Sequence, residues 1–171
     1  MPRRHGDGTT VDPVLRRFTA LRDATIGATD GDIGTVEDVY FDDLSWTVRY
    51  LVVDTGTWLS DRKVLLSPAS LREFSPEGLY ASAWAVTGFG IRATDGELGH
   101  VEDFLIDDQD WAIRFLIVDP RRWWPGPHVL LGTERIRGVT WNDSTIDADV
   151  TRETVRNAPR PDAWTASPPA A

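Results

Sequence analysis

The sequence predicts a mainly β protein made of two small antiparallel β-barrels in tandem, with short helices only at the N- and C-terminal ends. The first observation is an internal repeat: residues 26–66 and 91–131 align without a gap at an offset of 65 residues and are identical at 20 of 41 positions. The second is that short runs of β-branched and aromatic residues alternate with turn signals about every 8 to 12 residues, which is typical of sandwiches and barrels.

A hairpin is expected to open each copy. Asp30-Gly31 and Asp95-Gly96 each stand between β-prone runs. Asp-Gly is a strong signal for a two-residue type I′ turn, in which both central residues have positive φ. A second glycine follows three residues after the first in both copies, so we interpret four glycines as structural: Gly31, Gly34, Gly96 and Gly99.

The strongest strands are expected at residues 46–54 and 111–119, whose second halves are apolar on both faces. Trp46 and Trp111 begin these segments and are expected to seal the barrel ends. Arg49 and Arg114 occupy equivalent positions in them and are also interpreted as structural. We expect the two arginines to form ion pairs, with Asp38 and Asp103 as partners, or to cover the core with their alkyl stems.

The remaining elements follow from shorter patterns. Further strands are expected at residues 36–41, 63–67, 79–85, 101–106, 128–132 and 145–150. Asp12-Pro13 followed by an apolar stripe predicts a helix towards residue 21, and residues 151–158 predict a second helix of about two turns. The predicted organisation is an N-terminal arm (1–20), a first barrel (21–86), a second barrel with its helix (87–158) and a flexible tail (159–171). The short join at 85–89 predicts a compact pair.

Composition excludes several classes of function. Asp and Glu number 27 against 18 Lys and Arg, giving a formal charge of −9, so direct binding to nucleic acid or to an anionic membrane is not expected. The chain has no cysteine, which excludes disulfides, cysteine zinc sites and thiol nucleophiles. No apolar signal core or spanning segment is present, so we expect a cytoplasmic protein without membrane insertion.

Residues that could carry chemistry are few, and the sequence predicts no enzyme, no catalytic residue and no cofactor. Weak calcium or magnesium candidates are Asp30, Asp32, Asp95 and Glu97, but the spacing departs from the calcium-binding loop in which glycine follows the third acidic position. Solvated turns are the simpler interpretation. Glu37 and Asp38, as neighbours on a strand, are expected to point to opposite faces. His5, His100 and His128 show no metal-ligand spacing and are interpreted as surface residues.

Tryptophan gives the best candidates for an interaction. Trp58 and Trp123 match between the copies and lie in polar loops, the second of which reads PRRWWPGPH. Two tryptophans beside two arginines on a proline-rich loop have the composition of a protein-contact hot spot. The interaction candidates are therefore Trp58, Arg121, Arg122, Trp123 and Trp124. The alternative is that Trp123 or Trp124 folds back onto a barrel.

The repeated pattern resembles the PRC-barrel domain. It reads ATDGDIGTVEDVYFDD, WTVRYLVVDTGTWL and RKVLLSP in the first copy, and ATDGELGHVEDFLIDD, WAIRFLIVDPRRWWPG and HVLL in the second. This family's small β-barrel is shared by the photosynthetic reaction-centre H subunit and the ribosome maturation factor. The resemblance implies two tandem PRC-barrels and a role in docking onto larger complexes, and it implies no catalytic residues.

The function expected from this resemblance is a non-enzymatic protein-interaction or assembly module whose protein partner is unknown, with a homodimer as one form of association. A first alternative is a ribosome- or RNA-processing accessory factor that docks on a ribosomal protein. A second is a soluble subunit that reaches a photosynthetic membrane complex through a partner protein.

Overall fold

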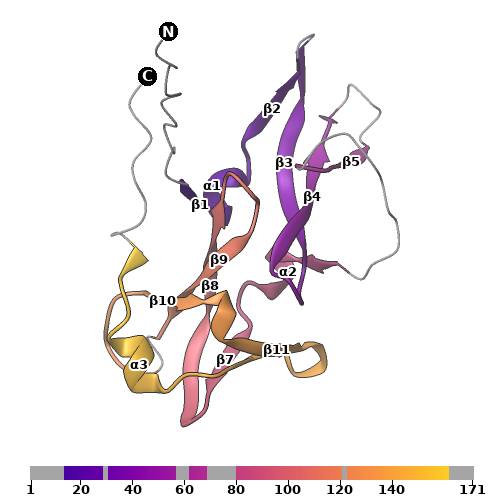
Figure 1. Cartoon of the computed structure of the whole chain (residues 1–171). Helices are drawn as coiled ribbons and strands as arrows, with labels where there is room; N and C mark the ends of the chain where they lie inside the picture. Colours follow the sequence, from indigo (N-terminus) through magenta and orange to yellow (C-terminus); the bar gives the residue numbers. More distant parts are fainter. Residues whose placement is uncertain (1–13, 29–30, 57–61, 69–79, 121–122, 162–171) are drawn as a thin grey trace, which may run out of the picture.

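The fold consists mostly of strands arranged in two sheets that lie side by side (Figure 1). A computed structural model describes residues 14–28, 31–56, 62–68, 80–120 and 123–161. Several predicted positions lie outside these residues: Asp30, Trp58, Arg121, Arg122, and most of the N-terminal arm and of the tail.

The first sheet is built from the first copy of the repeat. Its strands are β2 (Thr25–Ala28), β3 (Gly31–Asp42), β4 (Thr47–Asp54) and β5 (Lys63–Leu66), in the order β2-β3-β4-β5 with antiparallel neighbours. A short fifth strand, β6 (Ala81–Ser82), pairs with the far end of β3.

The second sheet has the order β10-β9-β8-β7-β12-β11. Its strands are β7 (Gly90–Ala93), β8 (Gly96–Asp107), β9 (Ile113–Asp119), β10 (Val129–Gly132), β11 (Ile136–Thr140) and β12 (Thr145–Ala148). All neighbours are antiparallel except β12 and β7, which are parallel. The strand β1 (Leu15–Arg17) pairs with the far end of β8.

The elements of the second copy repeat those of the first. Moving β2 and β3 by 65 residues gives the bounds of β7 and β8, and β4 and β5 fall within one residue of β9 and β10. The correspondence begins before the repeated sequence, because the helices α1 (Phe18–Leu21) and α2 (Ala83–Val86) also differ by 65 residues. An alignment by identity does not find this part of the repeat, because residues 15–24 (LRRFTALRDA) and 80–89 (YASAWAVTGF) are identical at one position only, an alanine.

Helices differ from the prediction at two places. The predicted helix towards residue 21 begins only at Phe18, because Leu15–Arg17 forms β1. Helices are also not confined to the ends: the strand predicted at 79–85 shortens to β6, and α2 follows it in the middle of the chain. The C-terminal helix is confirmed as α3 (Arg152–Arg156), whose N-cap Thr151 accepts from the Thr154 N–H. Two 3₁₀ turns, η2 (Thr133–Arg135) and η3 (Trp141–Asp143), complete the described elements.

The two copies exchange their leading segments. β1 and α1 precede the first copy in the chain yet contact β8 of the second, whereas β6 and α2 precede the second copy and contact β3 of the first. An aspartate fixes each helix at this exchange. Asp103 accepts from the N–H and the hydroxyl of Thr19, and Asp38 accepts from the Trp84 N–H and the Ser82 hydroxyl. One N–H in the first turn of each helix is thereby satisfied by the opposite copy.

The turns before β4 and β9 also interlock. The Val48 N–H donates to the Trp111 carbonyl, and the Ile113 N–H donates to the Trp46 carbonyl. Both tryptophans have positive φ, 52° and 61°, so they end the turn and do not begin a strand as predicted. Trp46 is buried and stacks on Phe41, whose ring is 6.1 Å from that of Phe104. One apolar core therefore runs through both copies.

Neither sheet closes into a barrel in the part of the chain that the structure describes. The predicted compact pair of tandem barrels is therefore not confirmed in these residues, and the pairing shows a physical reason. The end of β3 and the end of β8 each pair with a strand that leads into the opposite copy, and the apolar faces are covered by one shared core instead of by closure of each sheet on itself.

The predicted hairpins are present, but the turn is one residue earlier than expected. Ala93 pairs with Gly96, so Thr94 and Asp95 form the loop, and among the described residues of this turn only Gly96 has a positive φ. The second glycine of the motif has a clearer cause. A Cβ at Gly34 would lie 2.1 Å from the Asp54 carbonyl oxygen, and one at Gly99 would lie 2.3 Å from that of Asp119.

Candidate interaction surface

The loop between β9 and β10 presents the paired tryptophans. The N–H groups of Trp123 and Trp124 both donate to the Pro120 carbonyl, at 2.7 and 3.2 Å. Trp124 turns inward, packs against the core and carries the Arg156 guanidinium 5.6 Å from its ring centre. Trp123 remains 42% exposed. Of the candidates that the structure describes, Trp124 anchors the loop and Trp123 faces outward.

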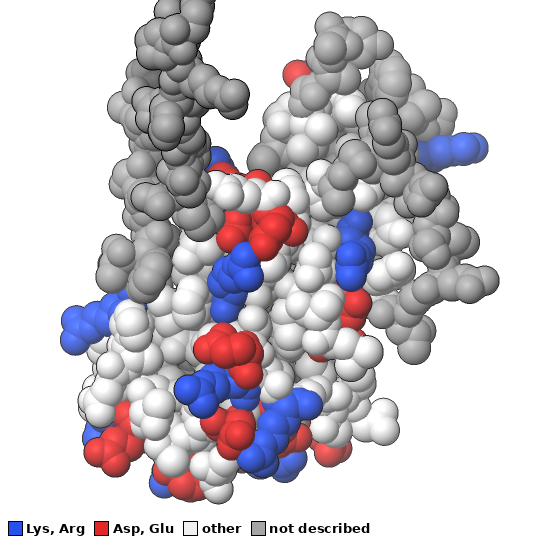
Figure 2. Space-filling view, viewed as in Figure 1, with Lys and Arg blue, Asp and Glu red and all other residues white. Residues whose placement is uncertain are grey.

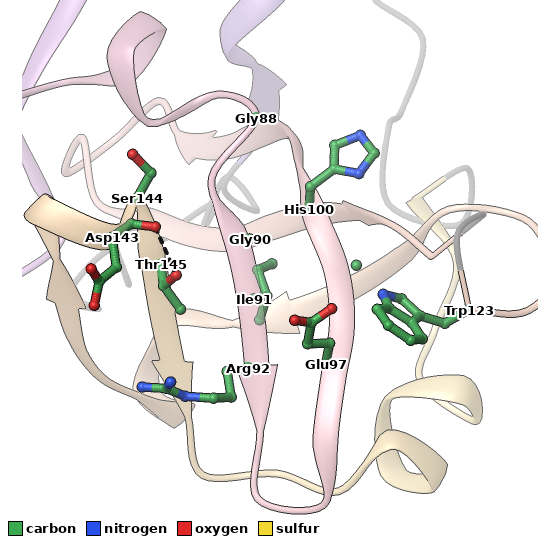
Figure 3. A pocket seen from close by; sticks show the side chains of 11 residues that line it. Gly88, Gly90, Ile91, Arg92, Glu97, His100, Trp123, Asp143, Ser144 and Thr145 are labelled. Atoms are coloured by element: carbon green, nitrogen blue, oxygen red, sulfur yellow. Dashed lines mark hydrogen bonds between the residues drawn. The ribbon is translucent and has the colours of Figure 1, made fainter.

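Trp123 borders two grooves. The first, of about 390 Å³, runs along β7 and β8 and is lined mainly by polar residues, which include Arg92, Glu97, His100, Asp143 and Thr145. Figure 3 shows Trp123 beside β8, with Glu97 and His100 on that strand. The second groove, of about 520 Å³, lies between Trp123, Trp124 and α3. A large apolar ring between two polar grooves is suited to contact with another protein.

Charges around the grooves are mixed in sign and largely paired. Arg92 lies 2.6 Å from Asp147, and this hydrogen bond raises the pKa of the Arg92 side chain. Figure 2 shows acidic and basic side chains alternating down one face of the molecule without a large patch of one sign. A surface of this kind favours a polar protein partner over a polyanion.

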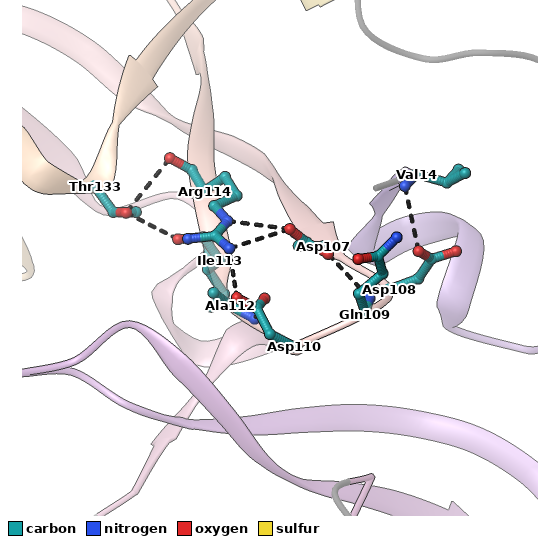
Figure 4. Close-up of polar contacts among 9 residues, drawn as sticks. All are labelled: Val14, Asp107, Asp108, Gln109, Asp110, Ala112, Ile113, Arg114 and Thr133. Carbon is teal, nitrogen blue, oxygen red and sulfur yellow. Dashed lines mark hydrogen bonds and ion pairs between the residues drawn. The ribbon is translucent and has the colours of Figure 1, made fainter. Parts of the chain in front are cut away.

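The predicted arginine partners are wrong. Arg49 pairs with Asp42 at 3.5 Å, and Arg114 pairs with Asp107 at 3.1 Å and also with Asp110 (Figure 4). Asp38 and Asp103 are instead occupied by the helix contacts described above. The two arginines therefore bind the turn before their own strand. Asp38 and Asp103 instead bind a helix of the opposite copy.

The expectation for Glu37 and Asp38 is also wrong. The pairing of β3 with β4 shifts between Val36 and Asp38, which makes Glu37 an extra residue in the strand. A bulge of this kind breaks the strict alternation of faces. Both acids consequently line one small hollow of about 150 Å³, together with Lys63 and Trp84.

Of the weak metal candidates, Asp30 lies outside the described residues, and the other three lie in different surroundings. Asp32 is exposed at the start of β3, Asp95 accepts from the Arg152 N–H at 2.9 Å, and Glu97 lines the first groove. Within the described ranges, the residues whose ligand atoms are close enough for a metal ion are His100, Glu102 and Asp119. Sequence reasoning missed this group because its members are far apart in the chain. The available signal was the change from Thr35 and Lys63 in the first copy to His100 and His128 in the second.

None of the described helices is long and apolar enough to cross a membrane, and the expected compartment remains a prediction.

Comparison with protein-family models finds a PRC-barrel domain at residues 17–74. The match runs from the end of β1 through β5, so it covers the first copy and α1. No curated protein matches the chain.

Proposed function

We propose that this protein is a non-enzymatic protein-interaction or assembly module built from two PRC-barrel units, and that Trp123 and its two grooves form the contact surface. The PRC-barrel domain at residues 17–74 favours an interaction or assembly role. The sequence identity between the copies and the matching strand bounds favour assigning the second copy to the same domain type.

The exposure of Trp123 is the observation on which the choice of surface depends. A tryptophan ring left 42% exposed contributes strongly to binding when a partner buries it. The Trp123 N–H already donates to the Pro120 carbonyl, and the neighbouring Trp124 packs against the core, so binding costs little additional ordering of these two residues. The neighbouring polar groups supply the hydrogen bonds expected at the rim of such an interface.

The acidic residues of the motif support a structural role over a catalytic one. Asp38 and Asp103 are held by helix N–H and hydroxyl groups, and Asp107 is held by Arg114. A general acid or base needs a carboxyl group that can reach a substrate. We therefore assign no catalytic residue to the chain.

Affinity capture from the native cell, followed by mass spectrometry, tests this function. The wild-type chain and Trp123→Ala are compared, with Trp84→Ala as the matched control because Trp84 is also exposed and its helix packs on β3 of the first copy. We expect Trp123→Ala to lose the main captured protein at least about tenfold while Trp84→Ala retains it, with equal thermal stability. Equal capture by all three chains would overturn the choice of surface.

The identity of the captured protein distinguishes the alternatives. A ribosomal protein would support the ribosome-associated role, and a subunit of a photosynthetic complex would support the membrane-complex role. Light scattering on the purified chain tests the homodimer: a dimer that Trp123→Ala converts to a monomer would make a second copy of this chain the partner.

A further inference from the structure

His100, Asp119 and His128 lie next to one another across β8, β9 and the start of β10. His100 on β8 pairs directly with Asp119 on β9, and His128 immediately precedes Val129, which pairs with Val118 at the start of β10. Glu102 joins this group because it is the extra residue where the register shifts between Val101 and Asp103. Two imidazoles and two carboxylates thus gather from three neighbouring strands.

Their distances are too long for hydrogen bonds but suit a bridging ion. His100 Nε2 lies 3.8 Å from Asp119 Oδ2 and 3.9 Å from Glu102 Oε2, and His128 Nε2 lies 3.8 Å from the same Asp119 oxygen. Metal bonds of about 2.0–2.2 Å to nitrogen and oxygen place the ligand atoms of a tetrahedral site roughly 3.3 to 3.6 Å apart. Small side-chain rotations therefore suffice to bring the ligand atoms of His100, Glu102 and Asp119 onto one ion, whereas His128, which is near the Asp119 oxygen, has to move further to join them.

A second observation points to the same place. The Nε2 atom of His128 is buried and makes no hydrogen bond within the described part of the molecule. Leaving a buried polar atom without a partner is costly, and such an atom calls for an explanation. An ion next to Asp119 would accept the lone pair of this nitrogen.

The first copy shows what occupies the corresponding position when the histidines are replaced. There Thr35 pairs with Asp54, and Asp54 pairs with Lys63. Threonine and lysine therefore stand at the positions of the two histidines, on either side of the same aspartate. The Lys63 ammonium lies 2.8 Å from Glu37, the counterpart of Glu102, and the hydrogen bond to Glu37 raises the pKa of Lys63. A covalently attached cation thus contacts Glu37 and stands on the strand that pairs with Asp54.

We propose that the second copy binds a divalent transition-metal ion of the zinc class at His100, Glu102 and Asp119, with His128 as the fourth ligand. The ion takes the place of the Lys63 ammonium and ties β8, β9 and β10 together. Mixed imidazole and carboxylate ligands favour zinc, copper or nickel over calcium or magnesium, which prefer oxygen alone. His100 and Glu102 are each more than 40% exposed, so an ion can enter from solvent, while Asp119 is buried.

Zinc titration of the full chain by calorimetry tests the site. The key variant is His100→Thr with His128→Lys, which gives the second copy the residues that the first copy already carries. We expect one zinc ion per wild-type chain and at least about a tenfold loss of affinity in this double variant. Magnesium and calcium should bind far more weakly to both chains. Bound cobalt, used as a spectroscopic probe, should give the intense visible bands of tetrahedral coordination only in the wild type.

The reverse exchange provides a gain of function. Thr35→His with Lys63→His gives the first copy the second copy's ligands, and we expect a second zinc ion to bind per chain. The isosteric Glu102→Gln is a milder variant that keeps the fold and should also weaken binding. Zinc should raise the melting temperature of the wild type but not of the His100→Thr, His128→Lys double variant.

Two results would overturn the site. One is zinc affinity that is the same in the wild type and in the double variant. The other is binding that disappears only when His5, outside the described residues, is replaced by alanine, because the ion would then belong to the N-terminal segment. Neither result depends on the proposed protein partner, since every measurement uses the isolated chain.

Discussion

The two copies share their motif residues but bury them to different degrees. Asp103, Asp107 and Asp119 are all less than 5% exposed in the second copy. Their counterparts Asp38 and Asp42 are half-buried, and Asp54 is exposed.

For Asp107 the cause lies outside the repeated segment. β1 pairs with β8 as far as Asp107, whereas β6 pairs only with Tyr40 and Phe41 and stops short of Asp42. The described part of the second copy also gains β11 and β12 on one edge. The repeated motif therefore sets strand register, while the neighbouring elements set burial and with it the energetic importance of each residue.

The largest expected effect concerns a feature that both copies share. Gly99→Ala and Gly34→Ala each place a methyl group against a backbone carbonyl, and we expect each to lower the free energy of unfolding by about 3 kcal/mol or more. Urea unfolding of the purified variants measures this loss. Gly138→Ala is the control, because a Cβ there meets no atom within 4 Å. Losses that differ strongly between the two variants would contradict the equivalence of the copies at this position.

The next largest effect should separate the copies. Asp103→Ala removes the acceptor of the Thr19 N–H and hydroxyl at a buried site, and we expect it to cost about 2 to 4 kcal/mol. Asp38→Ala should cost about half as much because Asp38 is half-buried. Chemical denaturation of both variants measures the two costs, with Asp103→Asn as a control that keeps one acceptor oxygen. A larger loss in Asp38→Ala would break the proposed link between burial and energy.

A smaller difference is expected for the arginines. Arg114→Ala leaves the buried Asp107 carboxylate without its guanidinium, and we expect a loss of about 1 to 2 kcal/mol. Arg49→Ala should cost less than about 0.5 kcal/mol, since Arg49 is exposed, Asp42 is only half-buried and the two are 3.5 Å apart. Thermal unfolding monitored by circular dichroism compares them, with Arg137→Ala as an exposed control. Equal losses for Arg114→Ala and Arg49→Ala would show that Asp107 finds another donor.

The smallest effect is on acid stability. Burial by itself would raise the pKa of Asp42, but hydrogen bonds from the Leu44 and Ser45 N–H groups outweigh it and lower the pKa below 3.8. A lowered folded-state pKa stabilises the protein above the unfolded value, and this contribution is lost as pH falls through the folded value. Asp42→Asn should therefore flatten the decline in unfolding free energy between about pH 5 and pH 2. Urea unfolding across this range compares the wild type with Asp42→Asn. The same decline in both would show that Asp42 does not contribute to the loss of stability in acid.

The strands of the motif were the most predictable part of the fold. β3, β4, β8 and β9 are long and apolar enough for their period to be read directly, Asp-Gly marks the start of β3 and β8, and the turns that follow these two strands carry Asp. α1 and α2 were not predictable as a matched pair, because only Ala20 and Ala85 are identical between them. Their common conformation comes from packing on β8 and β3, since isolated helices of four residues are not stable.

The candidate sites were likewise predictable from the sequence only in part. The composition of the tryptophan loop was visible in the sequence, but which ring faces outward depends on the core beneath Trp124 and on Arg156 in α3. The cluster of His100, Glu102, Asp119 and His128 was hidden because strand register brings together residues from three separate segments.

The sequence alone determined the repeat, the period of the main strands and the acidic, cysteine-free composition, because these depend on residue type and local spacing. The tertiary structure decided that the copies exchange their leading segments, share one core and, in the part of the chain that is described, form sheets that do not close. These features depend on contacts such as that between Thr19 and Asp103, which are 84 residues apart, and on the apolar surface that each copy buries against the other. Local spacing carries no information about which of two nearly identical strands a distant segment will pair with.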